Sequence, residues 1–392
     1  MKHSSIAEDL KPLTSLRFVA AMMIVGLHLK ASFVWPILAH VPAVAVQGVS
    51  FFFVLSGFIL THVYSARPLP GFRSFMTARF ARLWPVHVAA LLLLLTCVRG
   101  DSITFEGPGI FNRWVSLAVN LMLIQSWFPT LLHEFSYNSV SWSISTEMAF
   151  YAAFPLLLFG RRKHWLMCVA ISILSLAWVL LTATLIHLPA EGNPEIVTMS
   201  SFTYTTPLSR SVEFVTGMSA YGLWSRFIRQ QTIPIWAYTV VEVATVIGAA
   251  AWFSRYFWVT LADIGSMGAL PYWFGDAGSF WVFAILIIVF AGSKGWLGKL
   301  VGLPLFVWLG KISFSVYMFH QILIKIFALS FPQWASPLNY MCALIAVSAA
   351  SFYLIEEPGR KWLPRFLGVR ARPRGTSHGT MLEVENAVVG RP

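Results

Sequence analysis

Long apolar stretches alternate with short polar connections along most of the sequence. A helix of about 20 apolar residues crosses the hydrocarbon layer of a bilayer. Windows of spanning character occur at residues 13–35, 47–65, 79–98, 141–159, 164–188, 207–224, 234–253, 279–292, 303–329 and 337–356, of which 279–292 is short. The pattern predicts an all-α polytopic membrane protein with about ten transmembrane helices.

A further window at residues 114–127 bears on the orientation of the chain. Lysine and arginine favour the cytoplasmic ends of spans. If both termini are cytoplasmic and 114–127 does not cross, most of the 28 Lys and Arg residues lie on or beside the cytoplasmic side. A crossing there would move the basic cluster at 161–163 to the far side. We therefore predict cytoplasmic termini and an interfacial or re-entrant helix near 114–127.

Composition supports a membrane protein and excludes several other classes. Of the 392 residues, 57% are hydrophobic and 11% charged, and the mean hydropathy is +0.69. A soluble core cannot enclose so many apolar residues. The net charge of +12 arises from short basic clusters between spans, which membrane orientation explains better than nucleic-acid binding. The three cysteines stand singly in apolar runs, so neither a disulfide framework nor a metal site is expected.

The chain divides into three segments on this reading. Residues 1–12 form a cytoplasmic N-terminal segment without the features of a cleaved signal, so the first span is expected to remain as an anchor. Residues 13–365 form the transmembrane domain, and the polar residues 366–392 a disordered cytoplasmic tail. The external loops 189–207 and 255–279 could receive an acceptor, although such loops are more often simple connections.

The first span carries two ionisable side chains, Arg17 and His28. Eleven residues of helix separate them by about 16 Å along one face. With Arg17 at one membrane surface, His28 lies near the midplane. A cation at the mouth and an imidazole deeper inside suit a slot for an anionic headgroup with a reactive tail. The alternative is a snorkelling arginine with a histidine bonded to a neighbouring helix.

Two further elements carry polar groups. In the second span, Ser56 follows an aromatic run and is able to hydrogen-bond to another helix, although packing alone is the more common explanation of such a residue. The next element is expected at the cytoplasmic surface. Arg79 and Arg82 are three residues apart and share a helical face. Their guanidinium groups suit phosphate oxygens, and a purely topological role is the alternative.

Two spans carry polar residues on otherwise apolar helices. Glu147 lies one turn before Tyr151 and follows Trp142, and a buried carboxylate in this position needs a hydrogen-bond donor or a proton. Tyr317 and His320 continue a polar stripe from Ser313. For both helices the alternative is a structural contact between neighbouring helices.

Several catalytic signatures are missing from the sequence. It contains no phosphate-binding loop of the Gly-x-x-x-x-Gly-Lys-Ser/Thr type, no Gly-x-Ser-x-Gly elbow and no His-Glu-x-x-His helix. The energy for any synthesis must therefore enter with an activated substrate.

Seven blocks in order resemble the membrane-bound acyltransferase family three, whose members acylate O-antigen, Nod factors, peptidoglycan and macrolides. The blocks are LTSLRFVAAMMIVGLH, GVSFFFVLSGFIL, ARFARLWPV, SVSWSISTEMAFYAAFP, RSVEFVTGM, LGKISFSVYMFH and YLIEEPGRK. The resemblance implies a multi-pass acyltransferase of the bacterial cytoplasmic membrane that uses acyl-CoA, for example acetyl-CoA, as donor and no permanently bound cofactor.

The same resemblance implies roles for single residues. His28 would be the catalytic residue and Arg17 its partner in an arginine-ten residues-histidine motif, and Arg79 and Arg82 would lie near the donor headgroup. Glu147 and Tyr151 would match a Trp-Ser...Glu...Tyr block. With these we group Ser56 as catalytic, and Trp142, Tyr317 and His320 as substrate-binding candidates.

The sequence departs from the family in two places. Many members have Asp where this chain has Ser50, so Glu147 or Ser56 is expected to orient His28 instead. Phe314 stands where Tyr is frequent.

Together these residues suggest one mechanism. Acyl-CoA binds from the cytoplasm with its phosphates at Arg17, Arg79 and Arg82, and His28 acts as general base toward a hydroxyl of a carbohydrate or related acceptor. An acyl-histidine intermediate is the alternative route. The competing functions are a transporter of a glycan precursor or acyl group without covalent chemistry, and an inactive scaffold.

Overall fold

The computed structural model describes residues 10–65, 68–98, 112–190, 192–262, 268–292 and 294–368, and within them the chain is helical. Over these ranges the extended structure is one isolated bridge between Thr130 and Val197. The predicted all-α fold is confirmed, and the predicted tail beyond Gly368 lies outside the described residues. The α-helices are α1 (Lys11–Ser32), α2 (Gly48–Ser65), α3 (Phe72–Cys97), α4 (Arg113–Leu121), α5 (Leu131–Glu134), α6 (Trp142–Lys163), α7 (Trp165–Leu185), α8 (Met199–Tyr204), α9 (Pro207–Leu223), α10 (Ile235–Ala262), α11 (Leu270–Ala277), α12 (Phe280–Phe290), α13 (Trp296–Val301), α14 (Pro304–Ser330), α15 (Pro337–Ser351) and α16 (Glu357–Phe366).

Nine helical segments of the described chain are long and apolar enough to cross a membrane. The sequence window 279–292 is short for a span, but in the structure α11 leads into α12, and together they form a longer spanning segment, Leu270–Phe290. Helix α9 has 17 residues and continues directly into a π-helix, Trp224–Ile228. Its Arg210 and Glu213 lower its mean hydropathy, but it packs along α2. We therefore count α9 as a tenth crossing.

The directions of the helices fit ten crossings. Helices α1 and α14 run parallel, since Gly310 lies against Thr14 and His320 lies against His28 further along. Helices α2 and α9 are parallel as well, with Ser50 beside Arg210 and Gly57 beside Phe214. Ser15 donates a hydrogen bond of 2.6 Å to the Val301 carbonyl just before α14. We call the face of the bundle at which α1 and α14 begin the N-terminal face.

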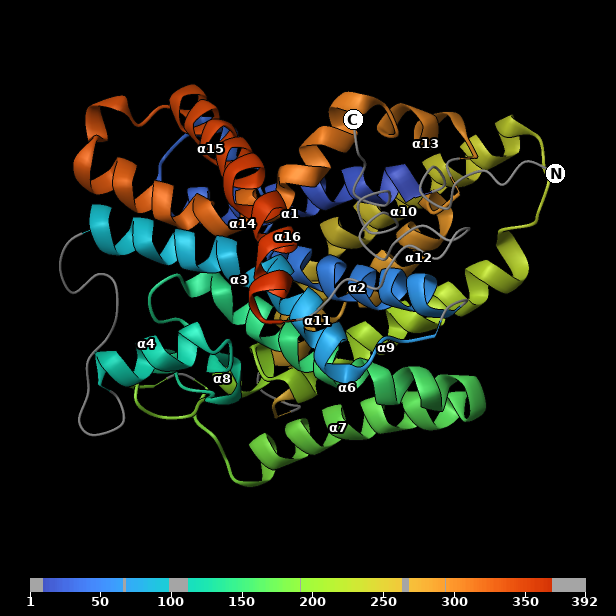
Figure 1. The fold of residues 1–392 in the computed structure, drawn as a ribbon, viewed down its shortest axis with the longest axis horizontal. Coiled ribbons are helices and arrows are strands. Elements are labelled where there is room, and N and C mark those ends of the chain that lie inside the picture. The colour runs from blue at the N-terminus through green and yellow to red at the C-terminus, as the bar shows by residue number, and fades with distance from the viewer. Residues whose placement is uncertain are drawn as a thin grey trace.

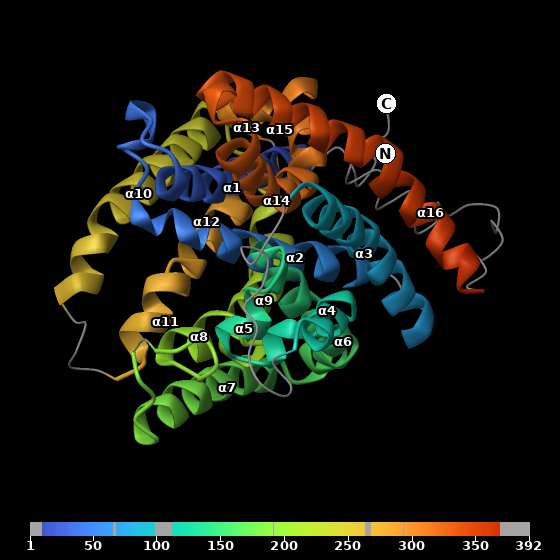
Figure 2. The same cartoon turned by 90° about the vertical axis from the view of Figure 1, so that its left-hand side faces the viewer.

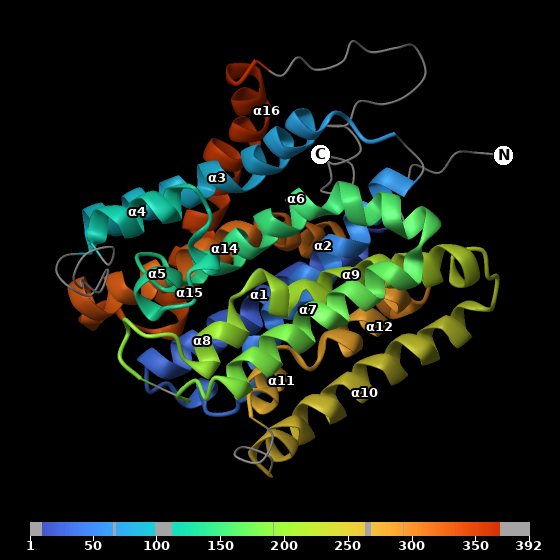
Figure 3. The same cartoon turned by 90° about the horizontal axis from the view of Figure 1, so that it is seen from below.

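Helices α1, α2, α9 and α14 form the middle of the bundle, whereas α7 and α10 lie at its edges (Figures 1 and 3). The edge helices are the least buried of the spans. Leu174 and Leu181 of α7 and Val240 and Ile247 of α10 are exposed. These apolar surfaces are suited to contact with lipid.

Helix α16 packs beside α3 and extends away from the bundle with it (Figure 2). Gly359 lies against the ring of Pro85, and Arg73 donates a hydrogen bond to the Leu367 carbonyl at 3.3 Å. The last described residues therefore lie beside the start of α3. In the order of crossings, α3 also begins at the N-terminal face, so both described ends of the chain lie there.

Glycines set how closely the central helices approach. A Cβ built at Gly217 of α9 would lie 1.9 Å from the Val54 carbonyl oxygen, and one at Gly57 of α2 would lie 2.0 Å from that of Phe214. A Cβ at Gly310 would lie 1.9 Å from the Thr14 oxygen. Small residues that bring backbones together are typical of helix pairs in membranes. Both central pairs, α2 with α9 and α1 with α14, depend on this contact.

The segment between α3 and α6 forms short helices. Helix α4 has nine residues, too few to cross a bilayer, and a 3-10 turn at Gln125–Trp127 follows it. Buried polar contacts hold this segment together and attach it to the start of α6. Asn120 donates to Ser136 within the segment at 2.7 Å. Gln125 donates to the carbonyl of Ser141, just before α6, at 3.0 Å, and the hydroxyl groups of Ser126 and Ser145 of α6 are 2.7 Å apart. The window 114–127 is therefore not a crossing helix, as predicted.

A buried carboxyl group fixes the end of this segment. Glu134 is fully buried and accepts a hydrogen bond of 2.5 Å from Thr205. Burial raises the pKa of Glu134 to about 8, with a smaller contribution from Asp276 and an opposing one from the Thr205 bond. The folded protein therefore holds a proton on Glu134 at neutral pH.

Replacing Gly217 by Ala is expected to weaken the α2 and α9 contact. The added methyl group must push the Val54 backbone away, at a cost of about 1–3 kcal/mol. The measurement is the apparent Tm of the purified protein in detergent. Gly248 of α10, whose Cβ would meet no atom within 4 Å, provides the matched Gly248→Ala control. Equal Tm values for the two variants would contradict the proposed close approach.

Replacing Glu134 by Gln is expected to change how stability depends on pH. The pKa of Glu134 rises from 4.5 to about 8 on folding, so the unfolded chain releases its proton first. Stability of the wild type should therefore fall as pH rises between these values. Tm measured from pH 5 to 8 should fall less steeply in Glu134→Gln. The partly exposed Glu195 gives the control Glu195→Gln, and a wild-type slope in Glu134→Gln would contradict the assignment.

Candidate active site

Five helices, α1, α2, α3, α6 and α14, enclose a cavity with an empty volume of about 960 Å³, part of it open to the outside. Its wall is mostly apolar, with Phe52, Phe53 and Phe314 among the lining residues. The polar and charged side chains that line it are Thr14, Arg17, Ser56, Arg82, Ser143, Glu147 and Tyr317. Candidate residues from five separate blocks of the sequence are thus brought to one site.

Two arginines mark the end of the cavity nearer the N-terminal face. Arg17 lies in the second turn of α1 with 9% of its surface exposed, and Arg82 reaches the same cavity from α3. Arg17 interacts electrostatically with Arg82, and also with Glu356 and Arg360 from the end of the chain. Glu356 and Arg360 form an ion pair of 2.5 Å. This end of the cavity is cationic and suits an anionic group.

Arg79 lies apart from the cavity wall. Its guanidinium lies over the rings of Phe75 at 5.6 Å and Tyr151 at 5.8 Å, and the residue is 3% exposed. It does not line the cavity. The two arginines predicted to act as a pair therefore differ in position, with Arg82 at the cavity and Arg79 behind Tyr151.

Glu147 lies in the wall and has two hydroxyl partners. Ser56 of α2 donates to its Oε1 atom at 3.0 Å, and Tyr151, one turn along α6, donates to the same atom. These bonds satisfy the carboxylate inside the bundle. We expected Glu147 or Ser56 to orient His28. In the described structure they contact each other, and the hydrogen bond of the His28 ring goes elsewhere.

The ring of His28 instead contacts His320. Nδ1 of His28 is 2.8 Å from Nε2 of His320, and the two ring centroids are 5.0 Å apart. His28 is half-buried and lies four residues before the end of α1, whereas His320 is fully buried in α14. His28 is not on the cavity wall. It is linked to the wall through His320 and Tyr317, which is one turn before His320.

Tyr317 lies in the wall between the cavity and the histidines. Its hydroxyl group donates to the Val140 carbonyl at 2.9 Å and is 2.8 Å from the Ser143 hydroxyl. Its ring is 5.8 Å from that of His320 and 6.0 Å from that of Phe52. Of the predicted substrate-binding residues, Tyr317 is thus the one on the cavity wall, and Tyr151 contacts Glu147 behind it.

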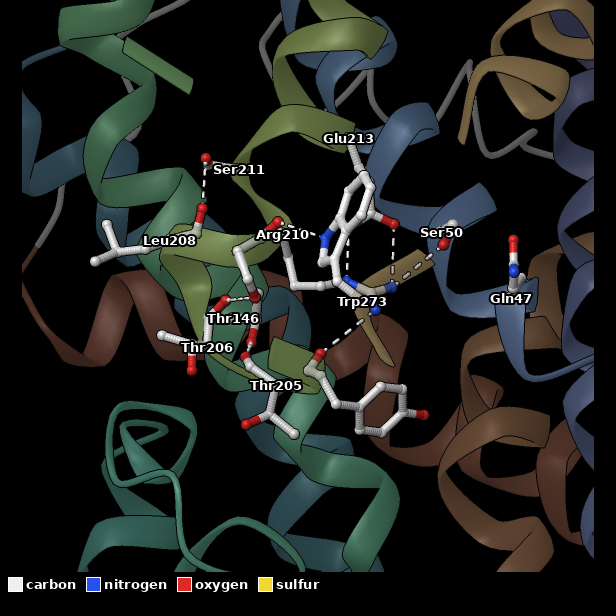
Figure 4. A network of polar contacts seen from close by, with 12 residues as sticks. Gln47, Ser50, Thr146, Thr205, Thr206, Leu208, Arg210, Ser211, Glu213 and Trp273 are labelled. Carbon is white, nitrogen blue, oxygen red and sulfur yellow. Dashed lines mark hydrogen bonds and ion pairs between the residues drawn. The ribbon is translucent and has the colours of Figure 1, made fainter. Parts of the chain in front are cut away.

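A second charged cluster, which the sequence analysis did not select, lies beyond the cavity near the start of α9. Arg210 Nε is 2.6 Å from Glu213 Oε2, and its Nη2 atom donates to Glu213 Oε1 at 3.0 Å and to Ser50 at 3.2 Å (Figure 4). Arg210 and Glu213 are fully buried. The residue in place of the family's aspartate therefore belongs to this cluster and not to His28.

Trp142 belongs to the same cluster. Its ring lies 5.6 Å from the Arg210 guanidinium and 4.6 Å from the ring of Tyr204. The residue is 3% exposed and is not on the cavity wall. The signal for this cluster was an arginine and a glutamate three residues apart in an apolar window, a spacing that places both on one helical face.

The chemistry available in the described part of the chain is that of acids, bases and hydrogen bonds. Among these residues, no group of three or more His, Cys, Asp and Glu side chains is placed to hold a metal ion. The arrangement offers two arginines that can bind an anion, a mostly apolar cavity wall, and the imidazole rings of His320 and His28 beyond that wall.

Comparison with known proteins gives the family. The family described as "Acyltransferase domain" matches residues 12–356. "Acyltransferase MdmB" of Streptomyces mycarofaciens is 34% identical over 154 residues, 38% of each chain. "Putative O-acetyltransferase SACOL0978" of Staphylococcus aureus (strain COL) is 23% identical over 353 residues, which cover 82% of this chain and 54% of that protein. No solved structure matches.

The family match covers most of the chain. The matched part of the chain spans about half of the length of the Staphylococcus protein and less than half of the length of the Streptomyces protein. The chain belongs to this acyltransferase family, and its long apolar helices indicate a multi-pass membrane protein.

Proposed function

We propose that the protein moves an acyl group, for example acetyl, from acyl-CoA to a hydroxyl of a carbohydrate or related acceptor. The donor enters from the N-terminal face, which we assign to the cytoplasm of a bacterial cell, and the acceptor reaches the site from the opposite side of the membrane. The observation that carries the proposal is the cavity that joins Arg17 and Arg82 to the wall formed by Tyr317.

The donor assignment rests on charge and shape. CoA carries phosphate groups at one end and a thioester at the end of a narrow arm. Arg17 and Arg82 supply guanidinium groups for phosphate oxygens. The mostly apolar wall beyond them runs to Tyr317, whose ring lies beside that of His320, and in this proposal the arm follows that wall. The Lys and Arg residues concentrated on this face support its cytoplasmic assignment.

The chemical step rests on His28. Its imidazole takes the proton of the acceptor hydroxyl as the oxygen bonds to the acyl carbon. The carbon–sulfur bond breaks, and the CoA thiolate leaves and receives that proton. Because His28 lies near the end of α1 that points away from the N-terminal face, an acceptor from that side has the shorter path to it. The relatives named as acetyltransferases acting on oxygen favour a hydroxyl acceptor.

Replacing His28 by Ala is expected to lower the rate of acyl transfer by about 10²- to 10⁴-fold, the usual contribution of a general base. The measurement is transfer of label from radiolabelled acetyl-CoA to the glycan, lipid and small-molecule fractions of the producing cells, incubated with purified protein. His40, an exposed histidine beyond the end of α1, gives the control His40→Ala. Wild-type turnover in His28→Ala would refute the proposed role.

Replacing Arg82 by Ala is expected to weaken binding of CoA by roughly ten- to hundredfold, because one charge-assisted hydrogen bond to phosphate is lost. The measurement is titration of purified protein with CoA. Arg73 lies on the same helix, is exposed and does not line the cavity, so Arg73→Ala removes an equal charge at the same face. Similar Kd values for the two variants would show that Arg82 does not contribute to CoA binding.

A further inference from the structure

The two histidines differ in how their rings are held, and the difference can be followed atom by atom. His320 is fully buried. Its Nδ1 atom lies 2.6 Å from the carbonyl oxygen of Tyr317, one turn earlier in α14. A carbonyl oxygen accepts hydrogen bonds and donates none. The proton of the neutral His320 ring is therefore on Nδ1.

The position of this proton decides whether Nε2, at the other end of the ring, donates or accepts a hydrogen bond. With Nδ1 protonated, Nε2 of a neutral His320 carries a lone pair and accepts hydrogen bonds. The atom that faces it at 2.8 Å is Nδ1 of His28. His28 must therefore carry its own proton on Nδ1, and its Nε2 atom keeps the lone pair that a general base needs.

The opposite arrangement requires a charge in the interior. If His28 accepted the bond, His320 would need protons on both nitrogens and would be a cation. The described hydrogen bonds of this buried ring go to a carbonyl oxygen and to His28, and none goes to a carboxylate. A buried cation without a paired anion is costly. The neutral His320 ring is favoured.

The backbone that carries His320 is fixed as well. Tyr340 of α15 is fully buried and donates a hydrogen bond of 2.9 Å to the His320 carbonyl oxygen. The side chain of Tyr317 is held by Val140 and Ser143. The acceptor atom of His320 is thus placed by contacts from α6, α14 and α15.

We propose that His320 is the positioning residue for His28, selecting the tautomer whose Nε2 atom takes the proton of the acceptor hydroxyl. This inference rests on the function proposed above. It gives His320 a role in place of the substrate contact expected from the sequence, and it supplies the partner that neither Ser50 nor Glu147 provides. When His28 gains a proton, its Nδ1–H group continues to donate to His320, so the pair needs no rearrangement during transfer.

Two amide substitutions separate the two ends of the His320 ring. The amide of Gln reaches the position of Nε2, so His320→Gln keeps an acceptor for His28. The amide of Asn reaches the position of Nδ1, so His320→Asn keeps the donor to the Tyr317 carbonyl and leaves His28 without its partner. We expect kcat within about tenfold of wild type for Gln and lower by about 10²- to 10³-fold for Asn.

The readouts separate positioning from loss of structure. Both variants should bind CoA with a Kd within about threefold of wild type, because Arg17 and Arg82 are untouched and line the cavity, whereas His320 does not. Equal kcat values for the two variants, or a more active Asn variant, would overturn the inference. If His28→Ala is inactive in that case, the proposed function stands. If His28→Ala is active, the proposed function itself fails.

A measurement of the histidine rings in the wild-type protein gives a second test that does not depend on folding of the His320 variants. With histidines labelled at both ring nitrogens, nuclear magnetic resonance distinguishes protonated from bare nitrogen, and His28→Ala identifies the signals of His28. We expect a protonated Nδ1 and a bare Nε2 at neutral pH. A His28 ring with its proton on Nε2 would overturn the inference.

Discussion

A polar side chain between helices in a membrane has no water to bind, so its partner must come from the protein itself. The described interior follows this constraint. Arg210 is paired with Glu213, Glu147 receives hydroxyl groups from α2 and α6, and His28 is paired with His320. Each partnership except the first joins helices distant in sequence. The side chains with candidate chemical roles therefore also hold the central helices in register.

Close backbone contact complements these bonds. The glycines at the crossings of α2 with α9 and of α1 with α14 leave no space for a side chain. The Arg210 cluster lies at one end of the α2 and α9 pair, and the histidine pair lies along α1 and α14. Packing and polar contact thus support one another along the same two helix pairs, and α1, α14 and α2 of these pairs contribute to the wall of the cavity.

The sequence predicted the helices well because each must be apolar over a fixed length. It also selected Arg17, Ser56, Arg82, Glu147 and Tyr317, which share the cavity, because charged and hydroxyl groups are uncommon in apolar windows. The contact between His28 and His320 was not predictable from spacing, since 292 residues separate them. Periodicity shows which face of a helix is polar and does not show which helix lies opposite. For the same reason, the sequence suggested a substrate contact for Trp142 and did not show that its ring packs on Arg210 of another helix.

Arg17 and His28 belong to one uninterrupted helix, and this has a consequence for the choice of donor. The rise of α1 separates their backbones by about 16 Å, so in the proposed function this helix sets the distance between the site for negative charge and the site of bond formation. An acyl phosphate, whose carbonyl carbon is attached to its phosphate, is too short to reach both marks. The proposed donor, coenzyme A, has a long arm between phosphate and sulfur and meets this length requirement.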